Sequence, residues 1–423
     1  MTTNHGPDSS ALAGKPQPQK VKRRRQDDMN PQERRATTAL ASIYGLRMLG
    51  LFLILPVFSV YARSLPGGNN HTLVGLALGI YGLTQAALQI PFGIASDHWG
   101  RKPVMMAGLT IFALGSFFAG FAHTLPLIIA GRAVQGAGAI SAAISAMIAD
   151  ATREQHRTKA MAFVGITIGA SFIVSLVAGP ALYRTISVPG MFLMTGVLAV
   201  VAIGVVKYVV PDVPMSAPAE AFGSGEKSSV VTPALLRLHF SIFALNFMQV
   251  SLFLVVPLAL VNNAGIALQN HWMVYLPTAL GGFIIAIPGI IVAEKYGFMR
   301  PALMGAVTLL TLAMFGFAAG YTNEVALIAA LFAFFIAFNL LEALLPSLVS
   351  RTAPQARKGL AIGVYNTAQS VGIFAGGAVG GVAAEFGGTA TVFLVCAAIG
   401  LVWLAVAAFI QSPPRREMLI PQQ

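Results

Sequence analysis

Twelve apolar runs, each about as long as a helix that crosses a bilayer, divide almost the whole chain. A transmembrane helix needs about 20 predominantly apolar residues, so the sequence predicts an all-α membrane protein with twelve transmembrane helices. Only 10% of the 423 residues are charged, whereas soluble domains carry about 25%. The predicted spans are 38–62, 73–96, 103–122, 125–149, 159–182, 189–210, 236–262, 271–293, 301–320, 324–350, 359–384 and 388–411.

Basic residues gather in the segments between alternate spans. With the N-terminus in the cytoplasm, the cytoplasmic side carries every Lys and Arg except Arg47, Arg63, Arg132 and Arg184. Positive charge concentrated in cytoplasmic loops is a signature of membrane topology. We therefore attribute the net charge of +12 to topology, expect no nucleic-acid partner, and place both termini in the cytoplasm.

The longest polar interruption separates the first six spans from the last six. Residues 211–235 are rich in Pro, Gly and Ser, which predicts a flexible cytoplasmic linker between six-helix bundles over 36–210 and 236–411. We expect a disordered basic cytoplasmic tail over 1–35 and a second cytoplasmic tail over 412–423. The basic tail either anchors the topology or binds anionic lipid headgroups.

The two bundles also repeat each other weakly in sequence. Residues 91–100 are echoed by 288–297, and residues 157–159 are echoed by 357–359 at nearly the same offset. Matching cytoplasmic turns in two six-span halves indicate a transporter built from parallel repeats related by a pseudo-two-fold axis.

A short charged turn between the second and third spans carries the most specific pattern, Gly93-x3-Asp97-x2-Gly100-Arg101-Lys102. Asp97 falls in the last turn of a helix, where the helix dipole disfavours a carboxylate by about 0.3–1 kcal/mol. It therefore needs a positive partner. Span eleven starts on the same side of the membrane, so its N-terminus directs positive charge toward that surface.

With this turn the chain resembles the major facilitator superfamily, which carries the same pattern between spans two and three. The motif Arg132-x2-Gln135-Gly136-x-Gly138 on span four is similar to a signature of the drug:proton antiporter branch. The resemblance extends from about Glu33 to the last span, and it implies the fold of that family at a bacterial inner membrane. Related members can carry a small soluble C-terminal domain, which we do not expect in this chain.

The resemblance implies that the turn is part of a conformational latch. The acid matching Asp97 docks on the start of span eleven, while Arg101 pairs with Asp150 at the end of span four. Together with Gly93 and Gly100, these residues would hold the two bundles together on the cytoplasmic side and favour the outward-facing state. The alternative is a solvated loop whose charges only set topology.

Three charged residues lie well inside predicted spans, namely Arg47, Arg132 and Glu342. Such residues cost about 2.5–3.5 kcal/mol on insertion scales and usually face a cavity or a partner. Burial favours the neutral form of a carboxyl group, so we expect Glu342 to carry a coupling proton, with Asn339 as a hydrogen-bond partner. The alternative is a permanent pair with Arg47, which is itself a candidate for proton coupling. Arg132 takes part in proton coupling, packs in the bundle, or extends outward to the membrane surface.

Glycines at four-residue spacing mark two spans. Gly75 and Gly79 lie in span two, and Gly377 and Gly381 lie in span eleven. This spacing allows helix backbones to approach closely, which suits either a sliding contact or static packing.

Other polar and aromatic side chains inside the spans are candidates for lining a substrate cavity, and ordinary helix packing is the alternative for each. These candidates are Tyr44, Tyr81, Gln85, Gln135, Phe163, Asn246, Gln249, Tyr275 and Asn339. The sequence contains no phosphate-binding loop, metal-ligand cluster or nucleophile triad, so we expect no enzymatic activity, metal or cofactor.

We therefore predict a monomeric, proton-coupled secondary transporter that exports small amphipathic or drug-like molecules by alternating access. Its partners would be a small-molecule substrate, protons and the lipid bilayer. Span five carries Gly179-Pro180 without the glycine pair that the antiporter pattern adds, so a proton symporter that imports a nutrient is an alternative. A non-transporting membrane sensor is the alternative from a different class.

Overall fold

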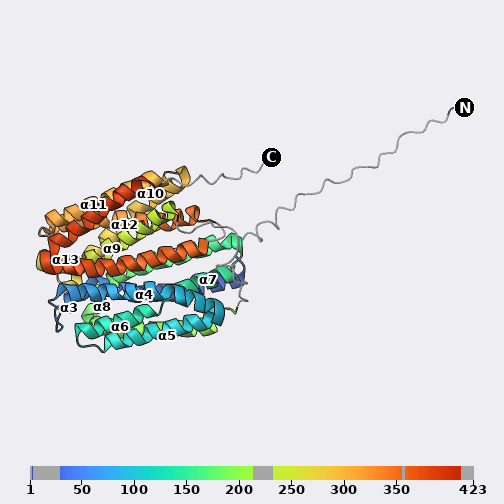
Figure 1. Cartoon of the computed structure of the whole chain (residues 1–423), viewed down its shortest axis with the longest axis horizontal. Helices are drawn as coiled ribbons and strands as arrows, with labels where there is room; N and C mark the ends of the chain where they lie inside the picture. The colour runs from blue at the N-terminus through green and yellow to red at the C-terminus, as the bar shows by residue number, and fades with distance from the viewer. Residues whose placement is uncertain (1, 3–28, 213–231, 355–357, 411–423) are drawn as a thin grey trace.

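A computed structural model describes residues 2, 29–212, 232–354 and 358–410, which form long helices running alongside one another (Figure 1). The N-terminal half contains α2 (Pro31–Phe52), α3 (Leu55–Ala62), α4 (His71–Trp99), α5 (Arg101–Gly120), α6 (Leu125–Ala137), α7 (Ser141–Ala151) and α8 (Glu154–Tyr208). The C-terminal half contains α9 (Pro233–Asn262), the 3-10 turn η1 (Leu268–Asn270), α10 (Trp272–Tyr296), α11 (Met299–Gly320), α12 (Glu324–Thr352) and α13 (Lys358–Ala408).

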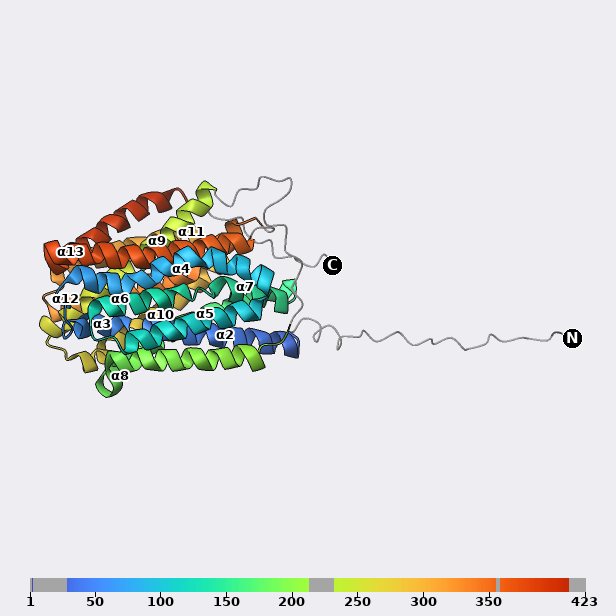
Figure 2. The ribbon, with the colours of Figure 1, turned by 60° about the horizontal axis from the view of Figure 1, so that its bottom comes forward.

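In the described part of the chain, ten helices or helix pairs are long and apolar enough to cross a membrane. This confirms the predicted all-α membrane architecture. Two of the helices, α8 with 55 residues and α13 with 51, far exceed the length that a bilayer requires. Each contains one backbone break, at Ser187 (φ 56°) in α8 and at Gly388 (φ 75°) in α13. Figure 2 shows α13 turning back on itself at one end of the bundle.

The first helix begins earlier than the sequence predicts. Residues 31–35 belong to α2 rather than to the tail, because Asn30 and Glu33 form a capping box. The Asn30 side chain accepts from the Glu33 N–H at 2.7 Å, and the Glu33 carboxylate accepts from the Asn30 N–H at 2.8 Å. Most of the predicted tail and linker, and all of 412–423, lie outside the described residues.

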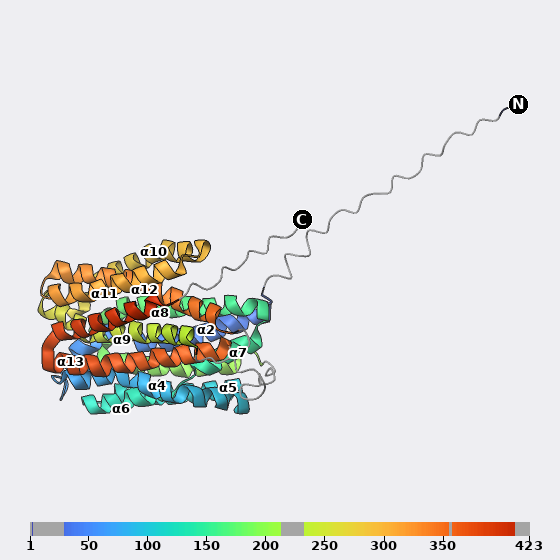
Figure 3. The same cartoon turned by 45° about the horizontal axis from the view of Figure 1, so that its top comes forward.

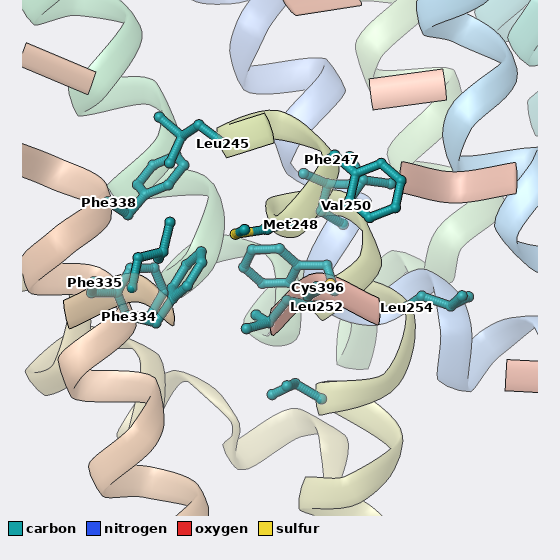
Figure 4. Packing of buried hydrophobic residues seen from close by; sticks show 14 of the residues in the cluster. Leu245, Phe247, Met248, Val250, Leu252, Leu254, Phe334, Phe335, Phe338 and Cys396 are labelled. Carbon is teal, nitrogen blue, oxygen red and sulfur yellow. The ribbon is translucent and has the colours of Figure 1, made fainter. Parts of the chain in front are cut away.

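Apolar side chains fill both halves, and one of the two buried clusters extends across the interface between them. In the N-terminal half a cluster lies between α2, α5, α7 and α8. In the C-terminal half α9 is buried along almost its whole length, and Figure 4 shows Leu245 and Met248 facing Phe334, Phe335 and Phe338 of α12. Figure 3 shows α10, α11 and α12 grouped on one side of the bundle, with α4, α5 and α6 on the other.

The two halves pack together most closely where α4 runs beside α13. A Cβ atom built on Gly75 would collide with the carbonyl oxygen of Gly377, and one on Gly377 would collide with that of Gly75. A Cβ on Gly79 would lie 2.8 Å from the carbonyl oxygen of Phe374. The close helix approach predicted from the glycine spacing is therefore present.

Polar contacts between the halves lie near the start of α4. Ser59 Oγ lies 3.5 Å from the carbonyl oxygen of Phe253, and Arg63 Nη1 lies 3.4 Å from Asn262 Oδ1. We name this end of the bundle, where α4 begins and α9 ends, the closed end. The opposite end carries the 93–103 turn and is named the turn end.

Candidate functional site

The 93–103 turn is organised by Arg101. Gly100 lies between α4 and α5 with φ 94°, a conformation that favours glycine. Arg101 Nε donates to Asp150 Oδ2 at 3.0 Å, and its Nη1 donates to Ser96 Oγ at 2.8 Å and also to Asp97. The expected contact between Arg101 and Asp150 is therefore present. Arg101 is the first residue of α5, and through these contacts it joins the ends of α4 and α7, whose helix dipoles are negative there.

The predicted contact of Asp97 with the start of span eleven is not seen in the described residues. Asp97 pairs instead with Arg101 in its own half, and its side chain is 46% exposed. At the turn end the described ion pairs Lys102–Asp212 and Glu294–Arg351 also stay within one half each. The halves meet at the closed end. At the turn end, Asp97 therefore pairs with the neighbouring Arg101 guanidinium instead of the start of span eleven.

Breaking the Arg101–Asp150 contact is expected to lower the stability of the N-terminal half. The side chains are 13% and 8% exposed, and a hydrogen bond between charged groups contributes about 1.5–3 kcal/mol. We expect Arg101→Ala and Asp150→Ala each to lower the melting temperature by several degrees, and the double variant to lose less than the sum. Cys396, buried in α13, allows unfolding to be followed with a thiol-reactive dye.

The exposed Lys159 provides the control, since Lys159→Ala removes a basic residue at the same end of the bundle. Its melting temperature should match that of the wild type. Strictly additive losses in the Arg101 and Asp150 variants would show that the two side chains do not stabilise each other.

Two buried arginines flank Tyr81 in the middle of the N-terminal half. Arg47 is 2% exposed, and its guanidinium donates to Tyr81 Oη at 2.6 Å, to Ser141 Oγ at 2.9 Å and to Gln85 Oε1 at 3.3 Å. The guanidinium carbons of Arg47 and Arg132 lie 5.8 Å and 5.3 Å from the Tyr81 ring centre. An aromatic face at these distances attracts a cation.

Arg132 is anchored to the backbone of α4. Its Nε donates to the carbonyl oxygen of Ala77 at 3.2 Å, and its Nη2 donates to that of Leu78 at 3.3 Å. Its Nη1 donates to Gln135 Oε1 at 3.1 Å, and Gln135 in turn donates to Ser116 at 2.7 Å. Because Arg132 is 1% exposed, the alternative that it extends to the membrane surface is wrong.

Glu342 lies in a separate polar cluster in the C-terminal half. Asn246 neighbours the Glu342 carboxyl. Its Nδ2 donates to the carbonyl oxygen of Ile242 at 3.1 Å, and Gln369 Nε2 lies 3.4 Å from its Oδ1. The buried Tyr365 hydroxyl has no hydrogen-bond partner in the described structure. Two predictions are corrected, because Arg47 is held within the N-terminal half, and Asn339 donates to a backbone carbonyl rather than to Glu342.

An aromatic cluster joins the two halves one helical turn from Glu342. The Phe172 ring of α8 lies 5.0 Å from Phe52 and 5.4 Å from Phe338, measured between ring centres. Phe334 stacks on Phe338 at 5.4 Å. This cluster was not predicted from the sequence, although the apolar spacing of 334, 335 and 338 on one helix was available as a signal.

The predicted cavity residues divide between these environments. Tyr81, Gln85 and Gln135 belong to the arginine cluster, whereas Asn246 and Asn339 lie in the C-terminal half. Tyr275 is fully buried, with its ring centre 6.1 Å from that of Phe253, which fits the packing alternative. Tyr44 and Gln249 are also buried, whereas Phe163 is 43% exposed.

Long apolar helices in two weakly repeated halves, with charged and polar groups buried within each half, define a membrane transporter rather than an enzyme. Residues 40–377 and 347–423 match the Major Facilitator Superfamily, and the chain therefore belongs to that family.

Known relatives agree with this assignment. The chain is 42% identical over 390 residues to the inner membrane transport protein YajR of Escherichia coli, covering 91% of this chain and 85% of that protein. It is 25% identical over 363 residues to the quinolone resistance protein NorA of Staphylococcus aureus, covering 79% and 86% of the two chains. A solved bacterial homologue of the human lysosomal transporter Spinster, in an inward-facing and occupied conformation, shares the fold with a TM-score of 0.73. Its sequence identity is 12%, and the match covers 92% of this chain and 98% of that one.

Proposed function

We propose that this protein is a proton-coupled secondary transporter that exports small amphipathic molecules by alternating access. In this proposal the breaks at Ser187 and Gly388 divide α8 and α13 into two spans each, which gives two bundles of six spans. The basic residues of the loops support a cytoplasmic location for the turn end.

The observation that carries the proton coupling is the isolation of Glu342. Among the described residues this acid forms no ion pair, while both buried arginines are held within the other half. A carboxyl group without a cation in an apolar span favours its protonated form. The neighbouring Asn246 amide can donate to an ionised carboxylate or accept from a protonated one, so the cluster accommodates both states.

Alternating access is supported by the unequal ends of the bundle. Backbone contacts between glycines bring the halves together toward the closed end, whereas Gly165 and Gly169 of α8 face open space. Gly359 and Gly363, in the first turns of α13, also face open space. We assign this arrangement to the state that is open at the turn end, which would be the cytoplasmic side.

Export of amphipathic molecules is supported by the aromatic cluster beside Glu342. Rings from both halves form a broad apolar cluster, which is buried in the described state, and the nearby amides would supply a few orienting hydrogen bonds to a bound molecule. The name of the relative NorA associates that protein with quinolone resistance, and we extend drug efflux to this chain as part of the proposal.

Purified protein in liposomes tests the function directly. The liposomes would enclose a pH-sensitive dye and receive an imposed pH gradient, with norfloxacin, tetracycline and ethidium as probe substrates. We expect at least one probe to move against the direction of proton flow and to accelerate proton movement. Probe and proton movement in the same direction would identify a symporter, and substrate movement that ignores the gradient would refute proton coupling.

A further inference from the structure

Glu385 connects the halves at the closed end in a way that the transport cycle proposed above does not use. Its Oε2 accepts from the backbone N–H of His71 at 2.6 Å and lies 3.3 Å from Nδ1 of the same residue. His71 is the first residue of α4 in the N-terminal half, whereas Glu385 belongs to α13 in the C-terminal half. One carboxylate therefore bridges the two bundles.

The contact caps the start of α4 from outside its own bundle. The first N–H groups of a helix have no partner within the helix, and the helix dipole makes this end positive. Asn70 satisfies one of them by accepting from the Leu73 N–H at 2.9 Å. Glu385 satisfies another, so the N-terminus of α4 is capped jointly by its own half and by the other half.

The position of Glu385 in α13 makes this partner necessary. Glu385 lies in the last turn before the break at Gly388, where the helix dipole is negative and disfavours a carboxylate. The start of α4 compensates for that position, because it offers an unpaired donor and the opposite end of a dipole.

The same pattern occurs at the other end of the same helix pair. Asp97 precedes Gly100 by three residues, as Glu385 precedes Gly388, and both glycines have positive φ. The two helices are antiparallel, since the start of α4 lies beside the last turn before the break in α13. The last turn of each helix therefore carries an acid. That acid lies at the end of the bundle where the other helix begins.

The corresponding backbone break in the N-terminal half lacks this acid. The break in α8 falls at Ser187, and Arg184 occupies the position three residues before it. A basic side chain is favoured at a helix C-terminus and needs no partner there. Of the two backbone breaks, the acid thus precedes the one in α13, which lies beside the start of α4.

We propose that Glu385 is a counter-latch that holds the closed end shut and is released when that end opens. It acts in alternation with Asp97, which then docks on the start of α13. In this reciprocal arrangement one helix of the pair is capped from the opposite bundle in each state, and the other helix lacks that cap. The proposal rests on alternating access, but it requires neither proton coupling nor any particular cargo.

Distances between spin labels at both ends of the bundle test the counter-latch. Cys396 is the one cysteine in the chain, so Cys396→Ser gives a clean background. Labels on exposed Asn69 and Gln269 report the closed end, and labels on exposed Gln155 and Lys295 report the turn end. In Glu385→Ala we expect a longer distance at the closed end and a shorter one at the turn end.

The expected shift is about tenfold in the ratio of the two states, which corresponds to the loss of about 1.4 kcal/mol, near the value of a hydrogen bond to a charged group. Glu385→Gln keeps an acceptor without the charge and should give an intermediate shift. His71→Ala keeps the backbone donor and should stay close to the wild type. Glu324→Ala provides the matched control, because Glu324 is an exposed acid at the closed end that lies within one half.

Distances in Glu385→Ala that equal those of the wild type, in protein with an unchanged melting temperature, would overturn the counter-latch. That failure is distinct from failure of the proposed function, which is read from proton and probe movement in liposomes. If Glu385→Gln alone is stable enough to measure, its shift relative to the wild type decides the question in the same way.

Discussion

Replacing Glu342 by glutamine is expected to abolish proton-driven transport while leaving the protein folded and able to exchange substrate across the membrane. Glutamine resembles a permanently protonated carboxyl group, so it cannot release the proton that couples the pH gradient to substrate movement. The half-buried position beside Asn246 tolerates an amide, since Asn246 can both donate and accept. We expect the accumulation ratio under an imposed pH gradient to fall by at least about tenfold, which is a loss of about 1.4 kcal/mol of driving force.

Two liposome measurements separate coupling from substrate binding. Gradient-driven uptake of a probe measures coupling, and exchange of labelled for unlabelled probe without a gradient measures binding and alternation alone. Glu324→Gln, on the exposed start of the same helix, should change neither rate. Undiminished gradient-driven uptake in Glu342→Gln would show that another group carries the proton.

The sequence was sufficient for the architecture because long apolar runs are a local property. Each predicted span overlaps a described helix. The break at Ser187 lies in the gap predicted after 182, and the break at Gly388 falls on the first residue of the predicted twelfth span. The start of α2 was missed because a capping box over Asn30 and Glu33 extends the helix into polar sequence. Polar caps are weaker sequence signals than apolar runs, although the spacing of these two residues was visible.

The functional contacts were harder to predict because they depend on which helices meet. The pairing of Arg101 with Asp150 was implied by the family resemblance, and the contact is present. By contrast, nothing in the sequence places Arg47 against Tyr81 rather than against Glu342. The start of α13, which was predicted as the partner of Asp97, belongs to the other half, and in the described structure Asp97 pairs with the neighbouring Arg101.

Introducing valine at Gly75 is expected to prevent the closed end from closing. The backbone of α13 lies directly against this glycine, and even a single Cβ would collide with the carbonyl oxygen of Gly377. A backbone atom cannot move aside as a flexible side chain can, so the two helices must separate. Because the contact lies between the halves rather than within one of them, we expect each bundle to remain folded.

Probe transport and the distances between spin labels each test, independently, whether the closed end fails to close in this variant. Gly75→Val should lower probe transport by about tenfold or more, equivalent to at least about 1.4 kcal/mol against the closed state, and lengthen the distance between labels at 69 and 269. Gly204→Val is the matched control, since a Cβ on Gly204 meets no atom within 4 Å. Normal transport in Gly75→Val would mean that the glycine contact is static packing that the cycle does not require.

The Gly75 variant should also fail in a different way from Glu342→Gln. Exchange of labelled probe needs both bundles to alternate, so Gly75→Val is expected to lose exchange as well as gradient-driven uptake. Glu342→Gln is expected to lose only the latter, because its helices still meet at the closed end. If both variants lose both activities, Glu342 is needed for alternation itself. Its cluster with Asn246 and Gln369 would then position α12 against α9 and α13 rather than carry the proton.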